Sequence, residues 1–191
     1  MIKNDEQLRD AVAVANEHIQ AIQDYLVQRN HADGKIRFPR GFLRTATHFR
    51  SQLGFIGDNN LKKNLSYALI LSDVLRWLTN RTDLTGTARE MVIKNAIILM
   101  GSICESIAID GTKGIIGKKH SFCERADRMV AKGIITGDLR DELRWLWEKR
   151  TGIHIYELDH QEYDTYGITD YNKAVTATKN LRDALERFHE R

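Results

Sequence analysis

Residues 137–160 read GDLRDELRWLWEKRTGIHIYELDH, and this stretch decides the expected fold. Asp138, directly after Gly137, can cap the start of a helix. With about 100° of rotation per residue, a stripe of mostly apolar residues follows one side of this helix. The stripe consists of Leu139, Leu143, Leu146, Arg150 and Ile153. An arginine therefore occupies a position where the pattern requires a leucine, and His154 follows one turn later on the same side.

The pair Arg150 and His154 is the first candidate for chemistry. A buried guanidinium is unfavourable unless it is paired, so Arg150 needs an explanation. The two residues lie one helical turn apart, which lets both side chains converge on one point. A fixed cation beside a titratable imidazole can act on a phosphodiester. A structural role stays open, because arginine side chains often extend to water and a lone histidine is more often structural.

Two segments around this helix carry a family resemblance. They are GSICESIAI at 101–109, which a basic loop follows, and AKGIITGDLRDELRWLWEKRTGIHI at 131–155. Together they resemble HEPN domains, and the resemblance covers about residues 58–191. It implies an all-α, usually dimeric domain, and many such domains are metal-independent ribonucleases. The family signature is an arginine, a polar residue that is usually asparagine, and then a histidine.

In this sequence Arg150, Thr151 and His154 take the places of the signature. Thr151 stands where asparagine is usual, and the spacing between the arginine and the histidine is shorter than the common one. If the site is active, the resemblance implies that RNA is cleaved by its own 2′-hydroxyl. His154 would move the proton, Arg150 would hold the phosphate oxygens, and Thr151 would replace the asparagine in part. Two copies of the motif facing each other would require a homodimer. No metal and no cofactor is expected.

Glu105 is a second unusual residue, because it lies in the most apolar segment of the chain, on the face of Ile98 and Gly101. A buried carboxylate needs a partner, and Arg150 is the natural candidate. The resemblance places a polar residue of this helix near the arginine and the histidine, so Glu105 joins the candidate catalytic residues. Ser102 is a weaker candidate for the same pocket. A purely structural ion pair that keeps two helices in register is an equal alternative.

The loop 110–120 reads DGTKGIIGKKH and is rich in glycine and basic residues. Its cations could meet RNA phosphates, although a solvated loop is the more common situation. The spacing of a P-loop is absent. The candidate RNA-binding residues are Lys113, Lys118, Lys119 and His120. No recognised ligand spacing is present among the histidines and aspartates at 154–164, so we expect no metal site.

Composition limits the class of protein. A single proline, few aromatic residues and abundant helix formers predict an all-α chain. The net charge of +3 permits nucleic-acid binding without indicating it. The two cysteines suggest no disulfide framework and hence a reducing compartment. We see no signal peptide, and the longest apolar runs are too short to span a bilayer, so we expect a cytoplasmic protein without a membrane partner.

The apolar periodicity predicts an antiparallel bundle of long helices joined by short loops. A helical extension over residues 1–57 is expected to precede a HEPN-like bundle over residues 58–191. The expected helices cover about 5–29, 41–53, 61–80, 88–109, 122–132, the segment from 138, and 170–190.

Three hypotheses about function follow from these residues. The first is a HEPN-like endoribonuclease in a toxin or defence role, with RNA as substrate and, for a toxin, a cognate antitoxin as partner. The second is a catalytically inactive HEPN-like module that binds RNA, a nucleotide or a protein. The third is a helical scaffold without a site. Thr151 and the short spacing favour the second hypothesis, whereas the arginine and histidine on one side of the helix favour the first.

Overall fold

The structure is a computed structural model that describes residues 1–117, 119–151, 162 and 164–190. All the regular elements of this described part are helical, which confirms the predicted all-α class. The elements are α1 (Asp5–Leu26), the 3-10 helix η1 (Ala32–Gly34), α2 (Ala46–Ser51), α3 (Asn59–Arg81), α4 (Gly86–Gly111), α5 (Phe122–Ala131), α6 (Gly137–Thr151) and α7 (Ile168–His189). They form two compact units, Met1–Arg40 and Gly41–Arg191.

The first unit contains α1 and η1. The Asn4 side chain caps α1 by accepting a hydrogen bond of 2.9 Å from the backbone N–H of Gln7. No residue of α1 is buried, and its apolar stripe is exposed. Where the chain turns back after α1, Gly34 lies against the Leu26 side chain, whose Cδ1 would be 2.6 Å from a Cβ at that position.

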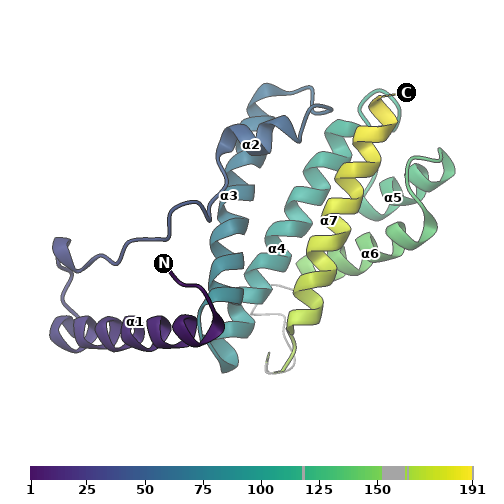
Figure 1. Ribbon diagram of the computed structural model, residues 1–191. Coiled ribbons are helices and arrows are strands. Elements are labelled where there is room, and N and C mark those ends of the chain that lie inside the picture. Colours follow the sequence, from purple (N-terminus) through teal and green to yellow (C-terminus); the bar gives the residue numbers. More distant parts are fainter. Residues whose placement is uncertain (118, 152–161, 163, 191) are drawn as a thin grey trace. The chain divides into compact units, whose positions relative to one another are not determined.

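The second unit is a helical bundle built around α4. Helices α3 and α7 lie on either side of α4, and α5 and α6 pack beside them (Figure 1). Helix α4 occupies the centre of the bundle because apolar residues face almost every direction around its axis. By length and composition α4 could cross a membrane, since its most apolar stretch has a mean hydropathy of 1.7. However, 56% of that stretch is buried inside the structure, as in the core helix of a bundle.

The boundary between the units lies between Arg40 and Gly41, and not after residue 57 as we expected from the sequence. The segment 41–57 belongs to the bundle because Phe49, Leu53 and Ile56 are buried in its core. The short helix α2 within this segment covers less than the expected 41–53. Three closely spaced apolar residues therefore attach this segment to the bundle, and α2 packs on α3.

Side chains cap the start of a helix at two places in the bundle. The Asp58 carboxylate accepts hydrogen bonds of 2.8 and 3.0 Å from the backbone N–H groups of Asn60 and Leu61 at the start of α3. At the start of α5, Ser121 and Glu124 form a reciprocal capping box. These hydrogen bonds hold the pKa values of the Asp58 and Glu124 carboxyl groups below their ordinary values.

Candidate functional site

The predicted contact between Arg150 and Glu105 is present where α6 meets α4. Arg150 Nη2 lies 3.0 Å from Glu105 Oε2, and Arg150 Nε donates a longer hydrogen bond of 3.4 Å to Ser102 Oγ. The guanidinium carbon lies 4.5 Å from the centre of the Trp147 ring, in a cation–π contact. The guanidinium is therefore held from three sides, by a carboxylate, a hydroxyl and an aromatic face.

The close approach of α6 to α4 explains how this arrangement is built. A Cβ atom on Gly101 would lie only 2.9 Å from Arg150 Cβ and 3.1 Å from Arg150 Cγ, so the arginine stem uses the space that glycine leaves. Trp147 is held in turn by Phe122 of α5, since the two rings are stacked with centroids 5.1 Å apart. Three helices thus fix the direction of one guanidinium.

The ion pair is partly accessible to solvent, because the side chains of Arg150 and Glu105 are each 29% exposed. A phosphate could therefore reach the guanidinium from outside. Any such anion would compete with Glu105 for the same cation, or would meet the edge that Glu105 leaves unoccupied. The geometry fits either an orienting carboxylate or a structural ion pair.

Of the other two signature residues, only Thr151 is among the described residues. Thr151 Oγ1 donates to the backbone carbonyl groups of Trp147 and Glu148, at 3.0 and 3.1 Å, so its hydroxyl is engaged within α6. This geometry does not present the hydroxyl as a replacement for the usual asparagine. His154 lies outside the described residues.

A buried ion pair that the sequence analysis missed links α4 to the chain before α7. Lys94 Nζ lies 2.5 Å from one carboxylate oxygen of Glu162 and 2.6 Å from the other. The Tyr166 hydroxyl donates to the same carboxylate at 3.3 Å, and burial, followed by the charge of Glu162, raises the pKa of Tyr166. Lys149 of α6 lies over the Tyr166 ring, at 5.3 Å from its centre. This cluster anchors residue 162, close in sequence to the segment that contains His154.

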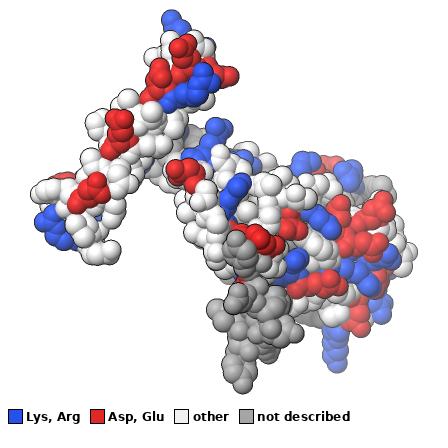
Figure 2. All heavy atoms as spheres, turned by 90° about the horizontal axis from the view of Figure 1, so that it is seen from below, with Lys and Arg blue, Asp and Glu red and all other residues white. Residues whose placement is uncertain are grey.

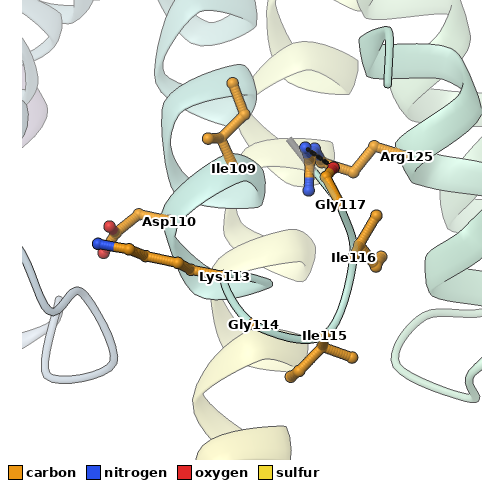
Figure 3. A pocket seen from close by; sticks show the side chains of 8 residues that line it. All are labelled: Ile109, Asp110, Lys113, Gly114, Ile115, Ile116, Gly117 and Arg125. Carbon is orange, nitrogen blue, oxygen red and sulfur yellow. Dashed lines mark hydrogen bonds between the residues drawn. The ribbon is translucent and has the colours of Figure 1, made fainter. Parts of the chain in front are cut away.

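The basic loop forms one wall of a cavity of about 540 Å³ at the end of α4 (Figure 3). Lys113 lines this cavity together with Asp110, Gly114 and three isoleucines. His120 lies outside it, 3.9 Å from Glu124 at the start of α5. Lys119 is exposed and Lys118 lies outside the described residues. The structure therefore does not bring the described candidates for RNA binding together at one point.

This cavity and the Arg150 contact are separate places. Along α4, Gly101 at the Arg150 contact and Asp110 at the cavity are about 14 Å apart, given the rise of an α-helix. On the face that Figure 2 displays, positive and negative side chains are interspersed rather than gathered in a large patch of one sign. The net charge of the chain is thus not concentrated on that face.

Arg125 is a residue that the sequence analysis overlooked. Its side chain is only 1% exposed, and it donates to Thr112 Oγ1 at 2.7 Å and to the carbonyl of Gly117 at 3.0 Å. Its Nε atom is buried without a hydrogen bond, and no carboxylate pairs with it in the part of the chain that the structure describes. Burial accordingly lowers the pKa of Arg125. The sequence contained a signal, because Arg125 shares the inward face of α5 with Phe122 and Met129.

Asp73 is the second overlooked residue, with a side chain that is 0% exposed on α3. It accepts hydrogen bonds from Arg44 through the backbone N–H at 2.9 Å and through Nη2 at 2.6 Å. Arg76 lies 3.3 Å away on the next turn of α3. Burial opposes ionisation of Asp73, but the hydrogen bonds from Arg44 and the charges of both arginines outweigh it and lower the pKa of Asp73.

Across the described residues, no group of three or more histidine, cysteine, aspartate or glutamate residues is placed to hold a metal ion.

No protein-family model, curated protein or solved structure matches this chain. The fold and the contacts thus define the class as an all-α helical bundle with a partly exposed arginine–glutamate pair between two core helices.

Proposed function

We propose that this protein is a HEPN-like endoribonuclease that uses Arg150 and His154. The single observation that supports the proposal is the fixed position of Arg150. Its guanidinium is paired with Glu105 at 3.0 Å, and the side chain of Arg150 remains 29% exposed, immediately before the segment that carries His154. A cation that is both oriented and accessible can stabilise the charge that develops on a phosphate in the transition state.

The proposed reaction needs no metal ion. His154 takes the proton from the ribose 2′-hydroxyl, or delivers a proton to the leaving 5′-oxygen. The 2′-oxygen forms a new bond to phosphorus while the bond from phosphorus to the 5′-oxygen breaks, which leaves a cyclic phosphate and a free 5′-hydroxyl. Arg150 contacts the non-bridging oxygens, and Glu105 acts as a positioning residue that holds the guanidinium.

The proposal includes an assembly and a biological role. Two signature motifs that face each other across a two-fold axis supply one acid and one base, so the active form is a homodimer. The substrate is RNA, and the role is that of a cytoplasmic toxin or defence enzyme. In a toxin role, a cognate antitoxin is the partner that restrains the activity.

A second candidate function is a catalytically inactive HEPN-like module that binds RNA, a nucleotide or a protein. The observation that favours it is the Thr151 hydroxyl, which is engaged by the carbonyl groups of Trp147 and Glu148 within α6. The pairing of Arg150 with Glu105 favours it as well, because a paired guanidinium is less available to a transition state.

An RNase assay on the purified full chain tests the first candidate. We expect wild type to cleave a mixed RNA panel in the presence of EDTA, and Arg150→Ala and His154→Ala to lose at least about a hundredfold in rate, in keeping with the loss of an oriented donor or a general acid or base. Arg140→Ala is the matched control, because Arg140 also lies on α6 but outside the stripe of Arg150. Circular dichroism establishes that each variant remains folded.

Two results would decide against the enzyme. Absence of cleavage of any RNA by wild type, or equal cleavage by wild type and both site variants, would exclude it. The binding module would then be tested by the salt dependence of RNA binding, because a protein that contacts several phosphates loses affinity steeply as salt increases.

A further inference from the structure

A groove runs over α4 in the bundle, between α3 with α2 on one side and α7 on the other. Figure 1 shows α4 between these two long helices. The groove has a volume of about 370 Å³, and its floor is made by Met100, Ile103 and Ile107, which share one face of α4. This size is within the range of small-molecule sites. Arg150 does not line the groove, since it contacts α4 at Gly101.

The charge of this groove is one-sided. Four cationic residues line it, namely Arg44, Arg76, Lys179 and Arg182, whereas no acidic residue is among the described residues that line it. Asp73 pairs with Arg44 and Arg76, and Asp183 pairs with Lys179 and Arg182, so two carboxylates offset only part of the charge. The groove therefore has an apolar floor and a positive rim, which suits an anion with an apolar body.

The cations are held in place before any ligand arrives. The carboxylate of Asp73 is completely buried behind Arg44 and binds its guanidinium through both Nε and Nη2, at 3.0 and 2.6 Å. On the other side of the groove, Arg182 Nη1 donates to Gln52 Oε1 at 2.9 Å. Guanidinium groups fixed in this way lose little conformational entropy when they bind a phosphate.

One hydrogen-bond donor of a residue that lines the groove is unpaired among the described residues. Tyr171 of α7 lines the groove and is only 4% exposed, yet its hydroxyl has no hydrogen-bond partner among the described residues. Burial raises the pKa of Tyr171, and Arg76, Asp73 and Arg44 are the charged groups that act on it. The hydroxyl therefore remains protonated at neutral pH, and Arg76 and Arg44 line the same groove.

We propose that this groove binds a small organic phosphate. The phosphate group contacts Arg76, Arg44 and the Tyr171 hydroxyl, because guanidinium forks and a neutral donor match its oxygens. The apolar or aromatic body of the ligand packs on Met100, Ile103 and Ile107 of α4. The inference concerns residues other than Arg150 and Glu105, so it does not rest on the proposed RNA cleavage.

The experiment is calorimetric titration of the full chain with adenosine 5′-monophosphate as an aromatic phosphate, and with adenosine and inorganic phosphate as its two halves. We expect saturable binding of the nucleotide, and binding of each half at least about tenfold weaker, since neither half meets both the rim and the floor. Arg76→Gln and Tyr171→Phe should each weaken nucleotide binding about tenfold or more, which is the usual effect of losing one hydrogen bond to a charged group.

Arg81→Gln is the matched control for this experiment. Arg81 is an exposed arginine at the end of the same helix as Arg76 and does not line the groove. Its substitution should leave nucleotide binding unchanged. If Arg76→Gln fails to fold, Tyr171→Phe alone tests the inference, because it removes only the hydroxyl that is proposed to contact the phosphate.

Three results of the titrations with the nucleotide and its two halves would overturn the inference. They are absence of nucleotide binding to the folded wild type, equal loss of binding in Arg81→Gln and Arg76→Gln, and binding of inorganic phosphate as tightly as the nucleotide. Binding of a short RNA that Arg76→Gln weakens, without binding of the mononucleotide, would likewise overturn it. RNA cleavage that persists in Arg76→Gln would separate this groove from the proposed catalytic site.

Discussion

Arg150 lies against Gly101 so closely that a Cβ atom on the glycine would be 2.9 Å from Arg150 Cβ. The contact involves the base of the arginine stem rather than its mobile end, so the side chain cannot move away without moving α6. The same approach brings Arg150 within reach of Glu105 and Ser102 on α4. The distance between α4 and α6 at this point therefore depends on the absence of a Cβ atom at Gly101.

Gly101→Ala should therefore destabilise the bundle. Alanine favours a helix over glycine by up to about 1 kcal/mol, but the enlarged contact costs about 1 to 3 kcal/mol in a packed interface. We expect a net loss in the free energy of unfolding in urea. Gly137→Ala is the control, because Gly137 starts α6 with nothing within 4 Å of a Cβ atom. A Gly101→Ala variant as stable as this control would contradict the close packing.

The Arg150 contact also shows how much of the site the sequence could predict. Arg150 on an apolar stripe and Glu105 in an apolar helix are local patterns, and each residue was expected to need a partner. Their pairing followed because the chain offered few other candidates. The sequence could not predict that Thr151 turns its hydroxyl toward the carbonyl groups of its own helix, because a hydroxyl at a helix end has several acceptors within reach.

Most of the fold was predictable because the long helices carry repeated apolar spacings. The boundary at Arg40 was not, because the segment 41–57 is short and joins the bundle through a few apolar side chains such as Phe49. Asp73 and Arg125 were missed for a related reason. Charged residues are expected on the surface, and only tertiary contacts distant in sequence, such as that of Arg44 with Asp73, show that they are buried.

Asp73 should make the bundle sensitive to acid. Its pKa is lowered in the folded state, so its ionised form contributes stability above the ordinary carboxyl pKa, and this contribution is lost as pH falls through the lowered pKa. Asp73→Asn removes the charge that Arg44 and Arg76 share. We expect a loss of at least about 2 kcal/mol at neutral pH, since several charged hydrogen bonds are weakened.

The test is the stability curve of both proteins measured by urea unfolding between about pH 3 and pH 7. The difference between wild type and Asp73→Asn should shrink toward the acid end, where the wild-type carboxyl group is also neutral. A difference that stays constant over this range would show that Asp73 contributes by its shape alone. Asp138→Asn, at an exposed position in the first turn of α6, serves as the control with a small effect.

At Arg125, the substitution that keeps the positive charge should destabilise the protein more than the substitution that removes it. Arg125→Met removes the charge and the two hydrogen bonds to Thr112 and Gly117, at a cost of about 1 to 3 kcal/mol. Arg125→Lys keeps the charge, but the lysine side chain is shorter and its compact ammonium group cannot reach both acceptors. We therefore expect the lysine variant to be the less stable of the two at pH 7.

A pH series separates this explanation from simple loss of packing. A lysine buried without a carboxylate has its pKa lowered in the folded state, so the unfolded chain binds more protons and stability rises as pH increases. The penalty of Arg125→Lys relative to Arg125→Met should shrink between about pH 7 and pH 10. A lysine variant more stable than the methionine variant at pH 7 would mean that an anionic partner compensates the charge.

The two cysteines should differ in reactivity, because they differ in burial. Cys104 is fully buried in α4, where burial raises the pKa of its thiol to about 12 although the Sγ atom lies 3.3 Å from Thr178 Oγ1. Cys123 on α5 is partly accessible, and burial raises the pKa of its thiol as well. Since the thiolate is the reactive form, a disulfide reagent should label Cys123 slowly in the native protein and leave Cys104 unmodified.

In Cys123→Ser, labelling of Cys104 then reports how often the bundle opens. Because Cys104 of α4 packs against Thr178 of α7, its exposure requires these two core helices to separate. The labelling rate should therefore rise with urea in parallel with global unfolding. Gly101→Ala should increase the rate by the factor that corresponds to its loss of stability. Rapid labelling of Cys104 in native Cys123→Ser would contradict the packing of α7 on α4, because a sealed core contact admits no reagent.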